Sequence, residues 1–288
     1  MDEEPVGASA AAIRSHYDVG DAFYALWLDP SLTYSAALWE RDDESLEAAQ
    51  RRKLDFHVEA ARAAGMRRVL DVGCGWGSAL ERLTRVHGVE HAVGLTLSPA
   101  QADRVRAAGN PRVAVRLESW TEHAPDAPYD AILSIGAFEH FARPEDDPKR
   151  KIDAYRRFFA RCRAMLVPGG RLSLQTSAFG LGRFVPGTPV SDVFPESHLP
   201  RLDEIAAAAD GVFEIERLRN DRLDYERTCR TWRDRLDARR DEAVRAAGED
   251  VVARYERFLD FARAGFESGI FVLLRIALRA LPVRATPR

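Results

Sequence analysis

The chain has 288 residues, of which 46% are hydrophobic and 30% are charged, and its formal net charge is −3. This length allows one large domain, or a domain with a substantial elaboration, and either can bury an ample core. The composition is that of a soluble globular protein, and no apolar run approaches the roughly 18 to 20 residues of a membrane span. The small net charge gives no long-range attraction to nucleic acid or to an anionic membrane, although peripheral membrane contact remains open.

The N-terminal stretch "MDEEPVGASA" carries acidic residues where a signal peptide would carry positive charge, so we expect a cytoplasmic protein. The three cysteines, Cys74, Cys162 and Cys229, have no paired spacing. We therefore expect structural thiols, with neither a disulfide framework nor a metal site.

The first elements in chain order are two helical stretches, over residues 12–28 and 45–65. Ser45 is expected to cap the second, and Glu47 lies in its first turn. Strand and helix patterns then alternate from residue 68 to 178. The predicted strands are 68–72, 91–95, 112–117, 129–135 and 170–176, and the predicted helices are 78–87, 98–108 and 151–166. We expect the last helix to stop at "VPGG", where Pro168 and two glycines break it before the next strand. This alternation predicts an α/β fold with a doubly wound, mostly parallel sheet.

The C-terminal third begins with a Gly- and Pro-rich stretch over 179–200, which we expect to be a loop facing the substrate. The stretch "VFEIERLRNDRLDY" (212–225) is interpreted as a long strand, 226–262 as helical, and "GIFVLLRIAL" (269–278) as a buried strand. Two strands around a helical insertion predict an antiparallel hairpin whose connection carries a helical lid. The predicted divisions are an N-terminal helical cap (1–64), a core (65–178), a substrate-facing loop with continuation of the sheet (179–225), a lid (226–265), and a final strand and tail (266–288).

The stretch "VLDVGCGWGSALERL" (69–83) predicts a strand, a glycine-rich turn and a helix. Its spacing is GxGxG, whereas a dinucleotide-binding turn is ordinarily GxGxxG, with a pyrophosphate at the helix N-terminus. A carboxylate at Asp71 would repel a pyrophosphate but attract the amino group of a methionine-like moiety. The turn therefore favours S-adenosylmethionine over NAD, while a purely structural role, with Asp71 capping the turn and the glycines serving packing, remains open.

Polar and aromatic residues follow the other predicted strands, where ligands of open parallel sheets bind. "GLTLSPAQ" supplies Thr96 and Gln101 as partners for a ribose, and "ESWTE" supplies Trp120 as a stacking surface for adenine. "SIGAFEHF" places Glu139 and His140 just beyond the sheet edge.

Five motifs occur together in the order found in cyclopropane fatty acid synthases and mycolic acid cyclopropane synthases. They are "YDVGDAFYALWLDPSLTYSAALWERDD", "LDVGCGWGSAL", "VGLTLSPAQ", "SIGAFEHF" and "DRLDYERTCRTWRDRL". The chain resembles this family of S-adenosylmethionine-dependent methyltransferases from about residue 14 to the final strand. The resemblance implies a Rossmann-like methyltransferase sheet with an N-terminal helical cap and a C-terminal helical lid. The candidate cofactor-binding residues are Tyr34, Ser35, Asp71, Gly73, Gly75, Gly77, Thr96, Leu97, Gln101, Ser119, Trp120 and Ile135.

The resemblance also implies a reaction in which an alkene attacks the sulfonium methyl and a bound bicarbonate removes a proton as a ring closes. The family holds that bicarbonate with a Cys, a Glu, a His, a Tyr and a main-chain carbonyl. Here the Cys position is Ala36 and the His position is Gln175, while Glu139 and Tyr225 remain. Hydrogen bonds to charged groups contribute about 1.5 to 3 kcal/mol each, so we expect a much weaker bicarbonate site, which disfavours cyclopropanation of lipid.

The predicted function is methyl transfer from S-adenosylmethionine, with S-adenosylhomocysteine as the product, to an alkene or electron-rich carbon of a hydrophobic small molecule, acyl chain or prenyl chain. The candidate catalytic residues are Glu139, which stabilises a cation or accepts a proton, Tyr225, which orients the substrate or relays the proton, Gln175 and His140. Three alternatives stay open: N-methylation of a small amine, true cyclopropane fatty acid synthesis, and a cofactor-dependent cyclisation without net methyl transfer.

The pocket is expected between the sheet edge, Tyr17 and Tyr34, and the C-terminal helices. Four aromatic residues there can be core or substrate wall: Trp232, Phe258, Phe261 and Phe266.

Overall fold

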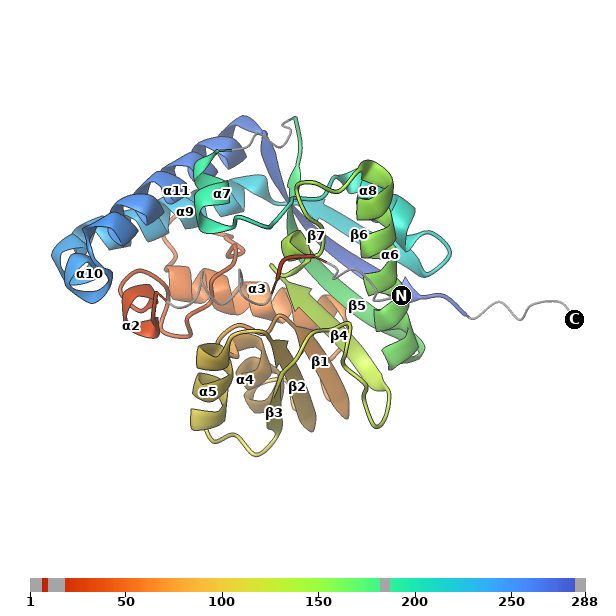
Figure 1. Cartoon of the computed structure of the whole chain (residues 1–288). Coiled ribbons are helices and arrows are strands. Elements are labelled where there is room, and N and C mark those ends of the chain that lie inside the picture. The colour runs from red at the N-terminus through yellow and green to blue at the C-terminus, as the bar shows by residue number, and fades with distance from the viewer. Residues whose placement is uncertain (1–6, 10–18, 182–186, 283–288) are drawn as a thin grey trace, which may run out of the picture.

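Seven strands form one mixed sheet in the order β3-β2-β1-β4-β5-β7-β6 in the computed structural model, which describes residues 7–9, 19–181 and 187–282 (Figure 1). The strands are β1 (Arg68–Val72), β2 (His91–Thr96), β3 (Val113–Leu117), β4 (Tyr129–Ile135), β5 (Leu166–Phe179), β6 (Phe213–Asn220) and β7 (Phe271–Ala280). Strands β1 to β5 pair in parallel, and β7 runs antiparallel between β5 and β6. The predicted fold class is confirmed.

Eleven helical elements surround this sheet in the described part of the chain. They are α2 (Asp21–Tyr24), α3 (Leu46–Ala60), α4 (Ser78–Arg85), α5 (Pro99–Ala107), the 3₁₀ turn η1 (Phe138–His140), α6 (Pro148–Met165), α7 (Pro189–Val193), α8 (Leu202–Ala209), α9 (Arg222–Ala238), α10 (Arg240–Ala247) and α11 (Glu249–Ser268). Ser45 caps α3 as predicted, since its side chain accepts a hydrogen bond from the backbone N–H of Ala48. Asp147 caps α6 in the same way, so that helix begins three residues earlier than expected.

The central parallel strands β1 and β4 are buried on both faces because helices cover both, whereas the edge strand β3 is partly exposed. Alternate residues of β1 enter two different clusters: Leu70 and Val72 pack with side chains of α6 and α8, whereas Val69 packs with side chains of α3, α4 and α5. The carboxyl ends of the strands stay free of these layers, and this edge of the sheet carries the site described below.

The C-terminal hairpin is formed by β6 and β7, and its connection is the helical insertion α9–α10–α11, as predicted. Figure 1 shows α9, α10 and α11 gathered with α7 on the side of the molecule away from β3. The N-terminal segment packs against this lid. The Trp27 ring packs edge-on against Trp232, and the hydroxyls of Tyr24 and Tyr255 are hydrogen bonded at 2.6 Å. Cap and lid therefore share one hydrophobic core.

Three predicted elements need correction. The predicted strand 212–225 is wrong beyond Asn220, because α9 begins at Arg222 and places Tyr225 in its first turn. Strand β5 begins at Leu166 and runs through the Pro-Gly-Gly stretch, with a register irregularity opposite Tyr129–Ala131, so no break separates it from α6. Over residues 19–28 only α2 is helical, and Tyr17, which we predicted to border the pocket, lies outside the described residues.

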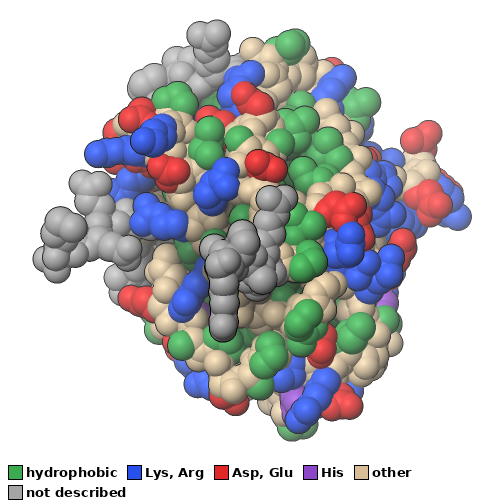
Figure 2. Space-filling model, turned by 90° about the vertical axis from the view of Figure 1, so that its right-hand side faces the viewer, with side chains coloured by type: hydrophobic (Ala, Val, Ile, Leu, Met, Phe, Trp, Pro, Cys, Tyr) green, Lys and Arg blue, Asp and Glu red, His purple; other side chains and the backbone are tan. Residues whose placement is uncertain are grey.

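Charges of both signs are interspersed on the surface, as Figure 2 shows for one face. In the charged lid, Arg239 pairs with Glu242 and Arg240 with Glu256. Cys74, Cys162 and Cys229 are buried free thiols. No described helix has both the length and the apolar character needed to cross a membrane.

Candidate functional site

The turn between β1 and α4 depends on its glycines for two different reasons. Gly73, Gly75 and Gly77 all have positive φ, of 79°, 54° and 88°. A Cβ on Gly73 would meet the Ala137 side chain at 2.5 Å, and one on Gly77 would meet Val105 at 2.8 Å, so these two glycines serve packing. A Cβ on Gly75 would meet nothing within 4 Å. Gly75 thus borders open space, into which a bound molecule can approach the backbone.

That space is a narrow groove of about 60 Å³ at the end of β1, called here the polar groove. Among its lining residues are seven of the predicted cofactor-binding residues: Tyr34, Ser35, Asp71, Gly73, Gly75, Gln101 and Ile135. Two further lining residues, Lys53 of α3 and Trp76 of the turn, were missed by sequence analysis. In the sequence, Lys53 is one charged residue among the arginines and glutamates of its helix, so nothing local marks it as a binding residue. Only the fold buries it at the groove.

Lys53 and Asp71 give the polar groove a buried pair of opposite charges. Lys53 is 1% exposed and Asp71 is 2% exposed. The Lys53 ammonium donates to Ser35 Oγ at 2.9 Å, while Oδ1 of Asp71 has no hydrogen-bond partner among the described residues. Burial raises the pKa of Asp71 to about 7, although the Coulomb attraction of Lys53 opposes the rise. Burial and the nearby Arg275 guanidinium lower the pKa of Lys53 to about 7.

The other predicted cofactor residues lie around the groove or away from it. Thr96 donates to Gln101 Oε1 at 2.6 Å, and Gln101 Nε2 is buried without a partner among the described residues. Gly77, Leu97, Ser119 and Trp120 do not appear in the groove lining. The Trp120 ring packs in the core with Phe141 and Phe158, at centroid distances of 5.2 and 5.4 Å. Its predicted stacking on adenine stays a prediction.

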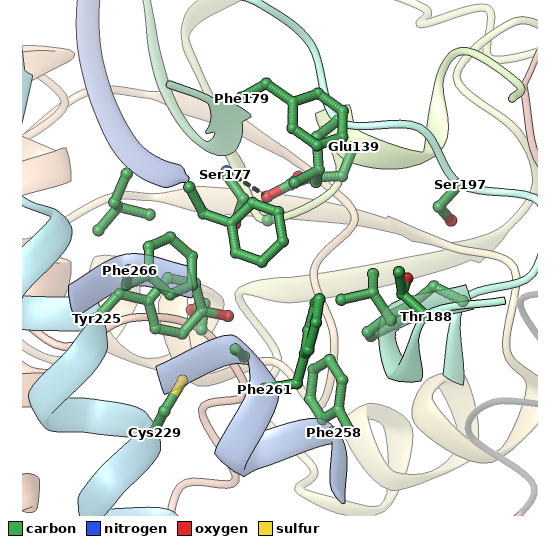
Figure 3. Close-up of a pocket in the computed structure, with 18 of the residues that line it drawn as sticks. Glu139, Ser177, Phe179, Thr188, Ser197, Tyr225, Cys229, Phe258, Phe261 and Phe266 are labelled. Atoms are coloured by element: carbon green, nitrogen blue, oxygen red, sulfur yellow. Dashed lines mark hydrogen bonds between the residues drawn. The ribbon is translucent and has the colours of Figure 1, made fainter. Parts of the chain in front are cut away.

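A second, much larger cavity of about 480 Å³ lies beneath the lid and is called here the apolar cavity (Figure 3). Its walls come from β5, the segment around α7, helices α9 and α11, and the start of β7. The four aromatic residues whose role was left open all face it: Trp232, Phe258, Phe261 and Phe266. Described residues of the 179–200 stretch, among them Phe179, Thr188 and Phe194, also line this cavity, and the stretch contains the short helix α7. That the stretch faces the substrate stays a prediction.

The polar groove and the apolar cavity meet at three residues that line both: Tyr34, Ser35 and Gly136. The only carboxylate among the described lining residues of the apolar cavity is Glu139 of η1. Its Oε1 accepts a hydrogen bond from the backbone N–H of Ser177 at 2.6 Å, drawn dashed in Figure 3, and its Oε2 is buried without a partner among the described residues. Burial raises the pKa of Glu139 to about 7, despite the hydrogen bond from Ser177. A carboxyl group in this state can exchange a proton near neutral pH.

The other three predicted catalytic residues, His140, Gln175 and Tyr225, also line the apolar cavity. His140 Nδ1 lies 2.5 Å from Ser197 Oγ, and burial lowers the pKa of His140 to about 4. A neutral imidazole engaged with a hydroxyl is a weak base. The Tyr225 ring packs on Phe266, with centroids 4.4 Å apart.

The residues at the family's bicarbonate positions are engaged with the protein itself. Gln175 Oε1 accepts from Arg275 Nε at 2.8 Å, and the carbonyl oxygen of Ala36 lies 3.3 Å from Arg275 Nη2. The Ala36 methyl group offers no hydrogen bond. This donor set does not fit a bicarbonate held in the family's manner.

Comparison with known proteins places this geometry in a family. The sequence profile described as mycolic acid cyclopropane synthetase matches residues 6–276. The chain belongs to this family. Cyclopropane mycolic acid synthase 2 of Mycobacterium bovis is 34% identical over 269 residues, covering 86% of this chain and 87% of the relative. The cyclopropane synthase MmaA2 from Mycobacterium tuberculosis has a TM-score of 0.85 at 31% identity, covering 96% of this chain and all of that one. The mycolic acid cyclopropane synthase CmaA1, complexed with SAH and CTAB, gives the same TM-score and coverage at 30% identity.

Members of this family are S-adenosylmethionine-dependent methyltransferases, and so is this protein. The polar groove fits the cofactor chemically. Three features of the groove suit a zwitterionic methionine moiety held against backbone. They are the Asp71 carboxylate, whose Oδ1 has no partner among the described residues, the ammonium of Lys53 and the open space beside Gly75. When bound, S-adenosylmethionine supplies the activated methyl group.

Proposed function

We propose that this protein transfers a methyl group from S-adenosylmethionine to an alkene or other electron-rich carbon in an apolar small molecule, acyl chain or prenyl chain. The observation that carries the proposal is that the two cavities adjoin. The polar groove, which suits the cofactor, shares the lining residues Tyr34, Ser35 and Gly136 with a large cavity that has aromatic walls. Relatives named as mycolic acid cyclopropane synthases, one of them complexed with CTAB, support an apolar, lipid-like acceptor.

In the polar groove we assign opposite roles to the two buried charges. Asp71 holds the ammonium of the methionine moiety, and Lys53 holds its carboxylate. Each charge is poorly solvated without the cofactor, because both side chains are buried. A zwitterion that supplies the two opposite charges returns both residues to their ionised forms. Gly73, Gly75, Gln101 and Ile135 complete the wall, as the family resemblance implies.

In the apolar cavity we assign the proton transfer to Glu139. Methyl transfer to an alkene forms a C–C bond, releases neutral S-adenosylhomocysteine and leaves a positive charge on the acceptor. Loss of a proton from an adjacent carbon quenches that charge. Glu139 has a pKa near 7 and one carboxylate oxygen without a partner, so it can take the proton directly. The aromatic walls exclude water, which would otherwise capture the cation.

The alternative that the site also supports is methylation of a small amine. An amine acceptor needs no bicarbonate, which agrees with Ala36 and Gln175, and Glu139 can deprotonate an ammonium. The apolar character of the cavity favours carbon over nitrogen, because an ammonium group would lose its hydration there with one carboxylate as compensation.

The test is incubation with S-adenosylmethionine labelled in its methyl group and matched panels of alkenes, prenyl compounds and amines. We expect label on carbon and stoichiometric S-adenosylhomocysteine. Label found only on nitrogen would defeat the carbon proposal, and a cyclopropane ring in the product would show true cyclopropane synthesis. A converted substrate with no S-adenosylhomocysteine would indicate a cyclisation without methyl transfer.

A further inference from the structure

Arg275 of β7 is buried with no exposed surface and lies directly opposite Gln175 of β5 in the antiparallel register. Its Nη1 lies 2.5 Å from Asp221 Oδ2, and its Nη2 donates to the carbonyl oxygens of Ala36 and Ala37 at 3.3 and 2.9 Å. Its Nε donates to Gln175 Oε1 at 2.8 Å. All three guanidinium nitrogens are therefore engaged, and the group is held in one orientation.

This contact fixes which end of the Gln175 amide faces Arg275. A guanidinium has only donors, so it must face the amide oxygen and not the amide nitrogen. His57 Nε2 lies 3.2 Å from the same oxygen, and His57 Nδ1 lies 2.8 Å from Ser173 Oγ. Burial and the charge on Arg275 keep the pKa of His57 well below 6.5, so its ring is neutral and can donate from Nε2 while accepting from Ser173.

The amide nitrogen of Gln175 has no hydrogen-bond partner among the residues that the structure describes. Its side-chain hydrogen bonds to described residues all end on Oε1, although Gln175 is only 1% exposed. Gln175 lines the apolar cavity with Glu139, and its backbone carbonyl accepts from the N–H of Gly136, one of the residues where the cavity meets the polar groove. A hydrogen-bond donor thus borders the cavity next to that junction.

We propose that Gln175 is a substrate-binding residue whose amide N–H donates a hydrogen bond to an oxygen atom of the substrate, close to the methylated carbon. Arg275 and His57 are positioning residues, since they orient the amide without touching the substrate. This inference rests on the proposed function and narrows its substrate class. The preferred acceptor is an apolar molecule that carries a carbonyl, hydroxyl or ether oxygen, because a plain hydrocarbon would leave the buried donor unpaired.

The test uses two probes of the same shape, 2-octanone and 2-methyl-1-octene, in which a carbonyl oxygen is replaced by a CH₂ group. Their Kd values are measured by ligand-observed NMR on the protein saturated with S-adenosylhomocysteine. We expect Gln175→Met to raise the Kd of 2-octanone by about 3- to 10-fold. The Kd of 2-methyl-1-octene should change by no more than about twofold. Arg275→Lys, which keeps the charge but displaces the donor, should also weaken the ketone selectively.

Thr188→Val is the matched control, because it removes a hydroxyl elsewhere on the cavity wall and should leave the ratio of the two Kd values unchanged. Gln175→Asn, which withdraws the amide, replaces the Met variant if that variant does not fold. Equal effects on both probes, or no effect on either, would overturn the proposal. The proposal would also be overturned if added bicarbonate displaced 2-octanone but not 2-methyl-1-octene, since the amide N–H would then bind that anion. Failure of the wild-type protein to bind S-adenosylhomocysteine would instead count against the proposed function.

Discussion

The polar groove and the apolar cavity adjoin at Tyr34, Ser35 and Gly136 but differ in size, chemistry and origin. The groove is about 60 Å³ and has Lys53 and Asp71 buried in its wall, whereas the cavity is about 480 Å³ and its wall is mainly aromatic. This difference in chemistry suits the two regions to two tasks, cofactor binding and selection of the acceptor. The groove suits a small zwitterion of fixed structure, and the cavity selects by shape and by the few polar groups that reach it, chiefly Glu139 and Gln175.

The largest expected effect is that of Glu139→Gln. It tests whether the methylation reaction takes place in the apolar cavity while the cofactor binds in the polar groove. Glu139→Gln should lower kcat by about 10²- to 10⁴-fold, because the base is lost, and should leave the Kd of S-adenosylmethionine unchanged. In the wild-type protein the raised pKa leaves Glu139 protonated below about pH 7, so kcat should rise with pH through about 7. The variant should lack this rise. A variant that keeps the pH dependence, measured by initial rates, would assign the base to another group.

A second comparison uses two glycines to isolate the groove. Gly75 and Gly65 have similar positive φ, of 54° and 70°, and a Cβ on either meets nothing within 4 Å. Alanine at either position should therefore carry a similar backbone strain of about 1 to 2 kcal/mol, seen as a similar fall in Tm. Of these two glycines only Gly75 lines the groove. Gly75→Ala alone should therefore raise the Kd of S-adenosylhomocysteine, measured by calorimetry, by about 10-fold. Equal Kd values in the two variants would show that the cofactor does not bind at this turn.

The smallest effect sharpens the role of the lid. Ala262 of α11 is buried and faces the apolar cavity, whereas Ala264 of the same helix is exposed. Ala262→Leu should fill part of the cavity and raise KM for a long acceptor by about 5-fold, with a smaller effect on a short one. Ala264→Leu is the control and should change neither. A rise in KM that is independent of acceptor length would argue against the cavity as the acceptor site.

The two regions also differed in how far the sequence predicted them. Most of the groove wall is encoded in short motifs, since Asp71, Gly73 and Gly75 lie within five residues of one another at a strand end. The cavity wall comes from segments more than 200 residues apart. Its aromatic residues at helical spacing are compatible equally with core and with a binding surface, and only the packing of α9 against α11 decides between them.

Errors arose where tertiary packing overrode local pattern. The stretch around Tyr225 alternates like a strand, but it forms the first turn of α9 because that helix packs against α11 and places Tyr225 on Phe266. Lys53 gave no signal because the charge partner that makes it informative, Asp71, lies in another element.

From the amino-acid sequence alone follow the alternation of strands and helices over residues 68–178, the glycine turn and the substitutions Ala36 and Gln175, since each depends on residues close together in the chain. Only the tertiary structure decides that Lys53 lies with Asp71 in one groove, that Arg275 binds the amide oxygen of Gln175, and that one carboxylate oxygen of Glu139 is buried without a partner among the described residues. The physical reason is that burial and hydrogen-bond partnership, which set the charge state and orientation of these groups, are properties of the neighbours that the fold brings together.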